Sequence, residues 1–249
     1  MNFQDHFSRL APAYARSRPG YPAELFDYLA DLAPVRDLAW DCGTGNGQAA
    51  RGLARHFLHV HATDASADQL GHAQPHDRVA YRQEPAESVS LASAVVDLVT
   101  SAVAVHWFDF DQFYAEVRRV LKPGGVIAVW TYHLPHVDAR VDPIVSHYYG
   151  TLLAGYWPDR LRYVDQRYRT LPFPFDELPA PVFDMSVSWT LEQLAGFLAS
   201  WSAAPRYQQA KGHHPLEPVW DDLTAAWGAN GGERVVSWQL YLRVGRVKG

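Results

Sequence analysis

Apolar side chains switch between helical and strand spacing along the first half of the chain. Residues 22–33 carry them on one face of a helix, and residues 48–57 repeat that pattern after a glycine-rich turn. A further amphipathic helix is expected at 111–121. Five short apolar runs have the length of strands: 38–40, 59–63, 79–82, 95–101 and 126–131. This alternation predicts a doubly wound α/β sheet whose ligand lies beyond the carboxyl ends of the strands.

The pattern loosens after residue 131. Residues 132–181 hold seven prolines and many aromatic side chains, which predicts a segment inserted to cover a site. Strand alternation returns at 182–189 and again at 234–244. Between them, Thr190 and Gln193 have the spacing of a capping box at the start of a helix.

Composition narrows the class of partner. The chain has 249 residues and a formal charge of −5, with acidic and basic residues interspersed. The lack of a basic stripe favours a small molecule over nucleic acid. Cys42 is the single cysteine, so neither an internal disulfide nor a multi-cysteine metal site can form. Without an apolar leader or a run of eighteen apolar residues, we expect a soluble, cytoplasmic protein with no membrane partner, and its oligomeric state stays open.

The turn at residues 41–47 carries the strongest signal in the sequence. Its glycines, Gly43, Gly45 and Gly47, occupy alternate positions, so the chain can bend sharply and bring backbone amides close to a ligand. A dinucleotide loop would place its third glycine at position 48, where this chain has Gln48. Asp41 adds a carboxylate at the strand tip, which suits a cationic ligand such as S-adenosylmethionine. Taken alone, the glycines are also compatible with an ordinary turn.

Three other residues each admit a functional and a structural interpretation. Asp64, about twenty residues beyond the loop, can accept a ribose hydroxyl pair or can cap the next helix. His106 can orient a substrate or take a proton, or it can simply pack beside Trp107. Arg18 can pair with a carboxylate of the cofactor or substrate, or be a solvated charge.

Two clusters are weighed in the same way. His72 and His76 have the spacing of metal ligands on a helix, but Pro75 disrupts that helix, and we expect no metal site. Four arginines of the insert could clamp a carboxylate, although such clusters are more commonly solvated: Arg160, Arg162, Arg167 and Arg169.

Considered together, the motifs resemble those of class I S-adenosylmethionine-dependent methyltransferases of the trans-aconitate methyltransferase-like, type 11 kind. They lie at residues 41–47, 64–66, 86–87, 96–100, 105–109 and 119–125. The opening 7–22 is similar to the N-terminal lid of that family, and residues 200–202 match the same subgroup. The resemblance covers most of the chain. It implies a Rossmann-like seven-stranded sheet with the last strand antiparallel, an N-terminal helical lid and an insert after strand 5.

The resemblance further implies one methyltransferase domain over residues 1–249. Its parts would be the N-terminal lid and helix (1–34), the cofactor-binding core (35–131), the substrate-covering insert (132–181) and the C-terminal strands and helices (182–249).

The resemblance implies a role for each residue at a position that matches the family. The glycine loop would pass the methionyl part of S-adenosylmethionine, Asp64 would hold the ribose, and residues 86–87 would lie along the adenine. Residues 84–87 depart here from the family, because they lack its common Asp-Ala pair. The expected cofactor contacts are Arg18, Asp41, Gly43, Thr44, Gly45, Gln48, Asp64, Ala65, Ala86, Glu87, Ser101 and Ala102. The expected substrate contacts are Tyr14, Tyr21, His106, Trp107 and His133.

The implied activity is methyl transfer to a small molecule, at a carboxylate or hydroxyl oxygen, by in-line displacement. A carboxylate arrives ionised, whereas a hydroxyl requires a base, for which His106 is the first candidate and His133 the second. A catalytically silent module that binds the cofactor or a partner is the alternative. A nicotinamide-dependent oxidoreductase is disfavoured, because the loop spacing differs and no Tyr-x-x-x-Lys pair is evident.

Overall fold

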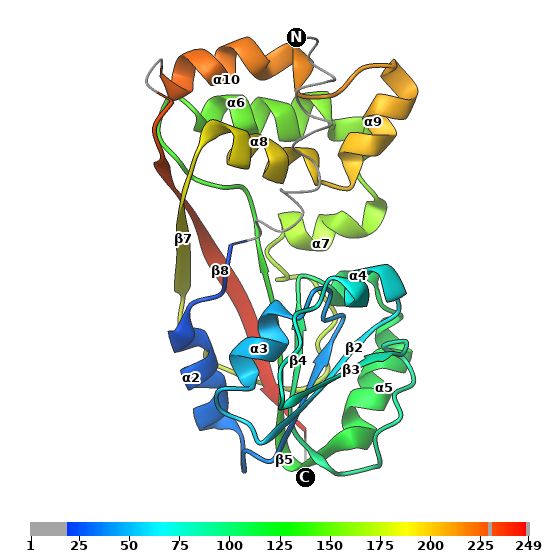
Figure 1. Cartoon of the computed structure of the whole chain (residues 1–249). Helices are drawn as coiled ribbons and strands as arrows, with labels where there is room; N and C mark the ends of the chain where they lie inside the picture. Colours follow the sequence, from blue (N-terminus) through cyan, green and yellow to red (C-terminus); the bar gives the residue numbers. More distant parts are fainter. Residues whose placement is uncertain (1–18, 229–230, 248–249) are drawn as a thin grey trace. The chain divides into compact units, whose positions relative to one another are not determined.

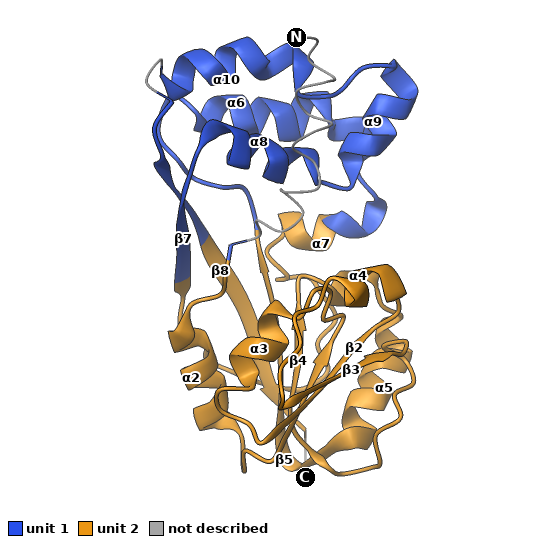
Figure 2. Cartoon of the chain, viewed as in Figure 1, with its two compact units in different colours: residues 1–19, 133–161, 184–238 blue, residues 20–132, 162–183, 239–249 orange. Residues whose placement is uncertain are grey.

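The computed structural model describes residues 19–228 and 231–247 (Figure 1). They form two compact units (Figure 2), which we describe separately. The sheet unit contains residues 20–132 and 162–183 and the chain from 239 onward, and the helical unit contains residues 133–161 and 184–238. The chain of the expected insert, 132–181, is therefore divided between the two units after Leu161. Tyr14 and Arg18 lie outside the described residues.

Within residues 19–228 and 231–247, eight strands form one sheet in the order β3-β2-β1-β4-β5-β8-β6, with β7 pairing β8 outside that order. Their bounds are β1 Leu38–Cys42, β2 His59–Asp64, β3 Val79–Gln83, β4 Val96–Ala102, β5 Leu121–Tyr132, β6 Asp176–Leu178, β7 Phe183–Trp189 and β8 Arg234–Arg246. The first five strands are parallel to one another, and β8 is antiparallel to β5. The predicted antiparallel last strand is thus confirmed, in a sheet of eight strands rather than seven.

The helices of the sheet unit are α2 Ala23–Leu32, α3 Gln48–Leu53, α4 Ala67–Gly71, α5 Phe110–Val120 and α7 Arg162–Asp165, with a 3-10 turn at Val105–Trp107. Figure 1 shows α2 and α3 side by side on one face of the sheet and α5 on the other. Because both faces are covered, β4 is buried along almost its whole length. Gly52 of α3 lets the helix approach the Phe26 ring of α2, since a side chain there would meet that ring.

Some element ends differ from the sequence prediction. Helix α3 ends at Leu53 rather than at residue 57, because the next amides, of Arg55 and His56, bond to carbonyls only three residues back instead of four. Strand β5 begins at Leu121 rather than at 126, because Leu121 already pairs with Val96 before the register shifts. The residues after Leu121 still end α5, as predicted.

The helical unit contains α6 Asp142–His147, α8 Leu191–Ala199, α9 Ala203–Lys211 and α10 Trp220–Trp227. Short 3-10 and π turns connect them: Tyr148–Leu152, Ala154–Tyr156, Asp159–Leu161 and Glu217–Val219. The predicted capping box at α8 is confirmed, because the Thr190 hydroxyl accepts from the Gln193 amide and the Gln193 side chain accepts from the Thr190 amide. Among the described residues, no helix has the length and apolar character needed to cross a bilayer.

Candidate functional site

The glycine loop lies between β1 and α3, next to the point where the strand order reverses from β1 to β4. Its three glycines, Gly43, Gly45 and Gly47, have left-handed φ values of 67°, 57° and 81°. A Cβ at Gly43 would lie 2.5 Å from that of Ala104, and one at Gly47 would collide with the Tyr81 ring. Among the described residues, a Cβ at Gly45 would meet only the Gln69 side chain, at 3.6 Å. Gly45 therefore presents bare backbone to open space, as a loop that passes close to a ligand requires.

Asp41 joins this loop to the centre of the sheet. Its carboxylate is fully buried and accepts hydrogen bonds from the hydroxyls of Thr44, at 2.6 Å, and Thr100, at 2.7 Å. Burial raises the pKa of Asp41 to about 6, although both hydroxyl bonds act in the opposite direction. The loop therefore rests on a carboxylate that is costly to ionise.

Asp64 joins the loop to the end of β2. Its Oδ2 accepts from the Gly45 amide and its Oδ1 from the Ser66 amide, each at 2.9 Å. The N-cap of α4 is Ser66, whose hydroxyl accepts from the Gln69 amide. Asp64 is therefore not the capping residue of that helix. Each carboxylate oxygen has a further lone pair with which it can accept a ligand hydroxyl.

A deletion of the Asp64 carboxylate tests whether this group binds a ribose or only supports the loop. We expect Asp64→Ala to weaken S-adenosylhomocysteine binding roughly 30-fold, about 2 kcal/mol, because hydrogen bonds to a charged acceptor are lost. The measurement is a calorimetric titration with S-adenosylhomocysteine and with its 2′-deoxy analogue. If the carboxylate accepts from the ribose, the variant discriminates less between the two ligands than the wild type. Equal discrimination would show that Asp64 supports only the loop.

Other expected cofactor contacts lie along the same edge of the sheet. Glu87 accepts from the Asp109 amide at 2.9 Å, so it ties the segment after β3 to the start of α5. Ala86 is buried beside it. Ser101 lies at the end of β4, and its hydroxyl is buried without a hydrogen-bond partner in the part of the chain that the structure describes. Such an unsatisfied group beside an open glycine loop fits a site that receives a polar ligand. Gln48 begins α3, Ala65 follows β2 directly, and Ala102 is the last residue of β4.

His106 lies in the 3-10 turn that follows β4 and is 2% exposed. Its Nδ1 lies 2.7 Å from the hydroxyl of Tyr168, which is fully buried. The Trp107 ring packs 4.9 Å from the imidazole and is 47% exposed. Burial holds the pKa of the Tyr168 phenol well above its usual range, so this group keeps its proton. A protonated phenol can fix the orientation and tautomer of the imidazole.

The remaining expected substrate residues fall in different places. Tyr21 belongs to the sheet unit, where its ring meets Trp130 edge to face at 5.4 Å. His133 belongs to the helical unit, where it packs against Tyr149 at 5.3 Å. Tyr149 in turn lies in an aromatic cluster with Trp157 and Trp201. The structure thus brings His106 and the glycine loop to the same edge of one sheet and assigns His133 to the other unit.

Two contacts of the site were not predicted from the sequence. Thr100 donates the second hydroxyl hydrogen bond to Asp41. In the sequence it is marked only as a hydroxyl residue near the end of an apolar strand. Tyr168 reaches His106 from 62 residues further along the chain. No local pattern distinguishes Tyr168 from the other tyrosines of the insert, so a contact of this separation could not be found by periodicity.

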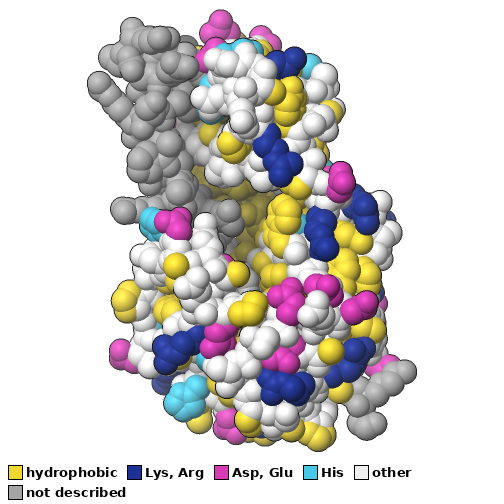
Figure 3. Space-filling view, turned by 90° about the vertical axis from the view of Figure 1, so that its right-hand side faces the viewer, with side chains coloured by type: hydrophobic (Ala, Val, Ile, Leu, Met, Phe, Trp, Pro, Cys, Tyr) yellow, Lys and Arg dark blue, Asp and Glu magenta, His cyan; other side chains and the backbone are white. Residues whose placement is uncertain are grey.

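Neither the surface charge on the face in Figure 3 nor the arrangement of possible metal ligands among the described residues indicates a further ligand. On the face shown in Figure 3, Lys and Arg side chains are interspersed with Asp and Glu. Over residues 19–228 and 231–247, no group of three or more His, Cys, Asp or Glu side chains is arranged to hold a metal ion. Helix α4 ends at Gly71, so His72 and His76 do not share a helix.

Comparison with known proteins identifies relatives of the whole chain. The methyltransferase domain family matches residues 40–129. A Dictyostelium discoideum protein classed as a methyltransferase is 32% identical over 93% of this chain and 89% of its own length. A solved structure from Anaeromyxobacter dehalogenans, classed as a type II methyltransferase, is 45% identical with a TM-score of 0.85, covering 92% of this chain and 97% of its own. The malonyl-[acyl-carrier protein] O-methyltransferase of Dechloromonas aromatica is 38% identical over 55% of each chain.

Proposed function

Because the chain belongs to the class I S-adenosylmethionine-dependent methyltransferases, we propose that it methylates a carboxylate or hydroxyl oxygen of a small molecule. The observation that carries the proposal is the buried His106–Tyr168 pair, whose histidine follows β4 at the edge of the sheet that holds the glycine loop. The relative from Dechloromonas aromatica supports an oxygen acceptor, because its name describes an O-methyltransferase. The narrower resemblance to trans-aconitate methyltransferases makes small carboxylic acids the first acceptors to test.

S-adenosylmethionine supplies, when bound, a methyl group on a sulfonium that leaves as a neutral thioether. The residues of this chain then have to hold it and exclude water. We propose that the backbone at Gly43 and Gly45 receives its methionyl part and that Asp64 accepts from the ribose. The adenine would lie along residues 86–87. The Ser101 hydroxyl, which lacks a hydrogen-bond partner among the described residues, would form a hydrogen bond with the methionine end of the cofactor.

The acceptor decides what His106 has to do. A carboxylic acid is ionised at neutral pH and needs only positioning and desolvation, for which a buried imidazole and the exposed Trp107 ring are suited. A hydroxyl has to lose its proton as the new bond forms. His106 can accept that proton at Nε2 when its Nδ1–H donates to the Tyr168 hydroxyl. Tyr14 and Tyr21 are proposed to contact the acceptor, as is His133.

A product assay distinguishes the two acceptor classes. The purified chain is incubated with methyl-labelled S-adenosylmethionine and a panel of small carboxylic acids, alcohols and amines. Methyl esters release labelled methanol in mild alkali, whereas methyl ethers and methylamines do not. Label in alkali-labile ester or in stable ether supports the proposal. Label confined to the amines would overturn it.

Removal of the imidazole tests the acceptor side directly. We expect His106→Ala to lower kcat by about 100-fold or more for a hydroxyl acceptor and by less than about tenfold for a carboxylate. The affinity for S-adenosylhomocysteine should change less than about twofold, because the glycine loop is untouched. His72→Ala, which removes an exposed imidazole after α4, is the matched control. Equal losses of turnover and cofactor affinity in His106→Ala would show that this residue acts on the cofactor and not on the acceptor.

A further inference from the structure

A gap interrupts the outer strand of the sheet unit. Strand β6 pairs with β8 only from Leu178↔Val244 to Asp176↔Arg246. The chain then leaves the strand at residues 179–182 before β7 begins at Phe183. Two of these four residues, Pro179 and Pro181, have no backbone N–H to donate to β8. These prolines therefore leave only two of the four backbone donors for pairing with β8.

Helix α2 holds the interrupted stretch at a distance from β8. The Tyr28 hydroxyl donates to the Pro179 carbonyl at 2.8 Å. The Tyr28 ring also packs against Phe183, with centroids 5.9 Å apart. These contacts fix both ends of the stretch to α2, so the gap beside β8 is a built feature of the unit.

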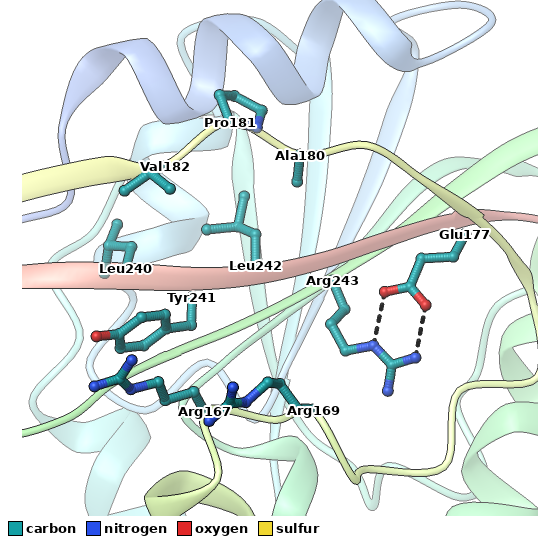
Figure 4. Close-up of a pocket in the computed structure, with 10 residues that line it drawn as sticks. All are labelled: Arg167, Arg169, Glu177, Ala180, Pro181, Val182, Leu240, Tyr241, Leu242 and Arg243. Atoms are coloured by element: carbon teal, nitrogen blue, oxygen red, sulfur yellow. Dashed lines mark hydrogen bonds and ion pairs between the residues drawn. The ribbon is translucent and has the colours of Figure 1, made fainter.

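The gap is a cavity of about 400 Å³ with one apolar and one cationic side (Figure 4). Leu240 and Leu242 point toward Ala180 and Val182, and Val182 is 63% exposed. The Tyr241 ring points the other way, and the Arg167 guanidinium stacks on it at 4.8 Å.

The charges in the cavity do not balance. Arg243 binds Glu177 with two hydrogen bonds of 2.8 and 2.7 Å, which neutralises the one carboxylate in the lining. Arg167 and Arg169 also line the cavity, and neither has a carboxylate partner among the described residues. The lining therefore carries about two excess positive charges on a chain whose formal charge is −5.

The backbone of Arg167 also has an unusual conformation beside the cavity. Arg167 has a φ of 55°, a left-handed conformation that is unfavourable for residues other than glycine. Its amide bonds to the Val164 carbonyl, and its side chain is fixed by Tyr241. Arg167 is exposed to solvent, and its contact with Tyr241 keeps the guanidinium beside the cavity.

We propose that this cavity binds a small organic carboxylate with an apolar tail, at a site that shares no residue with the glycine loop or His106. The carboxylate would pair with the guanidinium groups of Arg167 and Arg169, which offer the forked donors that carboxylates match. The tail would cover Leu242 and Val182. The proposal does not depend on which acceptor is methylated, because its site and its test are independent of turnover.

The test uses the full chain with labelled valine and leucine methyl groups and three probes. Octanoate has both the anion and the tail, inorganic phosphate has the anion alone, and octanol has the tail alone. We expect octanoate to give saturable shifts of the Val182 and Leu242 methyl resonances. Binding of the other two should be at least tenfold weaker, and 0.5 M salt should weaken octanoate binding.

Two charge-neutralising variants and a control complete the experiment. Arg167→Gln and Arg169→Gln should each weaken octanoate binding about tenfold, whereas Arg55→Gln, which removes an exposed guanidinium after α3, should not change it. Circular dichroism checks the fold, and Arg169→Gln decides the matter if Arg167→Gln does not fold. Unsaturable shifts, equal binding of octanol or phosphate, or full affinity in the folded arginine variants would each overturn the proposal.

Discussion

The Gly45→Val variant is expected to lose S-adenosylmethionine binding by at least about 100-fold, or about 2.7 kcal/mol, while it stays folded. Gly45 is the loop position whose Cβ would clash with none of the described residues, since its nearest described neighbour, Gln69, lies at 3.6 Å. A branched side chain would fill that space and would keep the cofactor from the backbone. The measurement is a calorimetric titration with S-adenosylmethionine, S-adenosylhomocysteine and NADH.

Gly124→Val is the matched control for backbone strain. Gly124 has a φ of 76°, and no described residue lies within 4 Å of its Cβ position, so valine there causes a similar conformational penalty of about 1–2 kcal/mol. It lies at the amino-terminal end of β5, away from the loop. We expect lower stability in both variants and lost binding only in Gly45→Val. Unchanged affinity in a folded Gly45→Val protein would refute the assignment of the loop.

The second large effect concerns the pH dependence of stability and the Asp41 carboxyl. Its pKa is raised from 3.8 to about 6 by burial, so the folded state holds a proton that the unfolded state releases between these pH values. The free energy of unfolding therefore falls as pH rises through this window. A shift of about two units corresponds to about 3 kcal/mol, which is absent above pH 6 and present below pH 4.

Asp41→Asn should remove this pH dependence. An asparagine has the same shape and can still exchange hydrogen bonds with Thr44 and Thr100, but it has no charge to bury. We expect the two proteins to be similarly stable at pH 4 and the variant to be more stable by about 3 kcal/mol at pH 7.5. Urea unfolding across this range measures the difference.

Asp31→Asn provides the control, because the Asp31 side chain is 75% exposed. It should leave the pH dependence of unfolding unchanged. A difference between wild type and Asp41→Asn that stays constant from pH 4 to pH 7.5 would show that the Asp41 carboxyl titrates normally.

Elements formed by local patterns could be predicted from the sequence. Strands β1 to β5 follow the predicted apolar runs, and the capping box at Thr190 lies within four consecutive residues. The glycine loop was found in the same way, because alternating glycines require the left-handed angles that the structure shows. The family resemblance then supplied the antiparallel last strand.

Features made by distant residues could not be predicted. The contact of Tyr168 with His106 and the cavity beside β8 each join segments that are about 60 residues apart. The division of the expected insert at residue 161 is likewise a matter of packing, since its prolines and aromatic residues continue on both sides. Composition indicated that the insert was unusual but could not tell which half belongs to which unit.

The position of β8 has a consequence for biosynthesis. It lies between β5 and β6 in the sheet yet is the last of the described strands to be made, 102 residues after the end of β5. At about 5–20 residues per second, translation leaves the edge of β5 without its partner for on the order of ten seconds. An exposed strand edge of this kind can pair with other chains. Slow translation or a shortage of chaperones should therefore lower the yield of this protein before any defect in its finished site becomes visible.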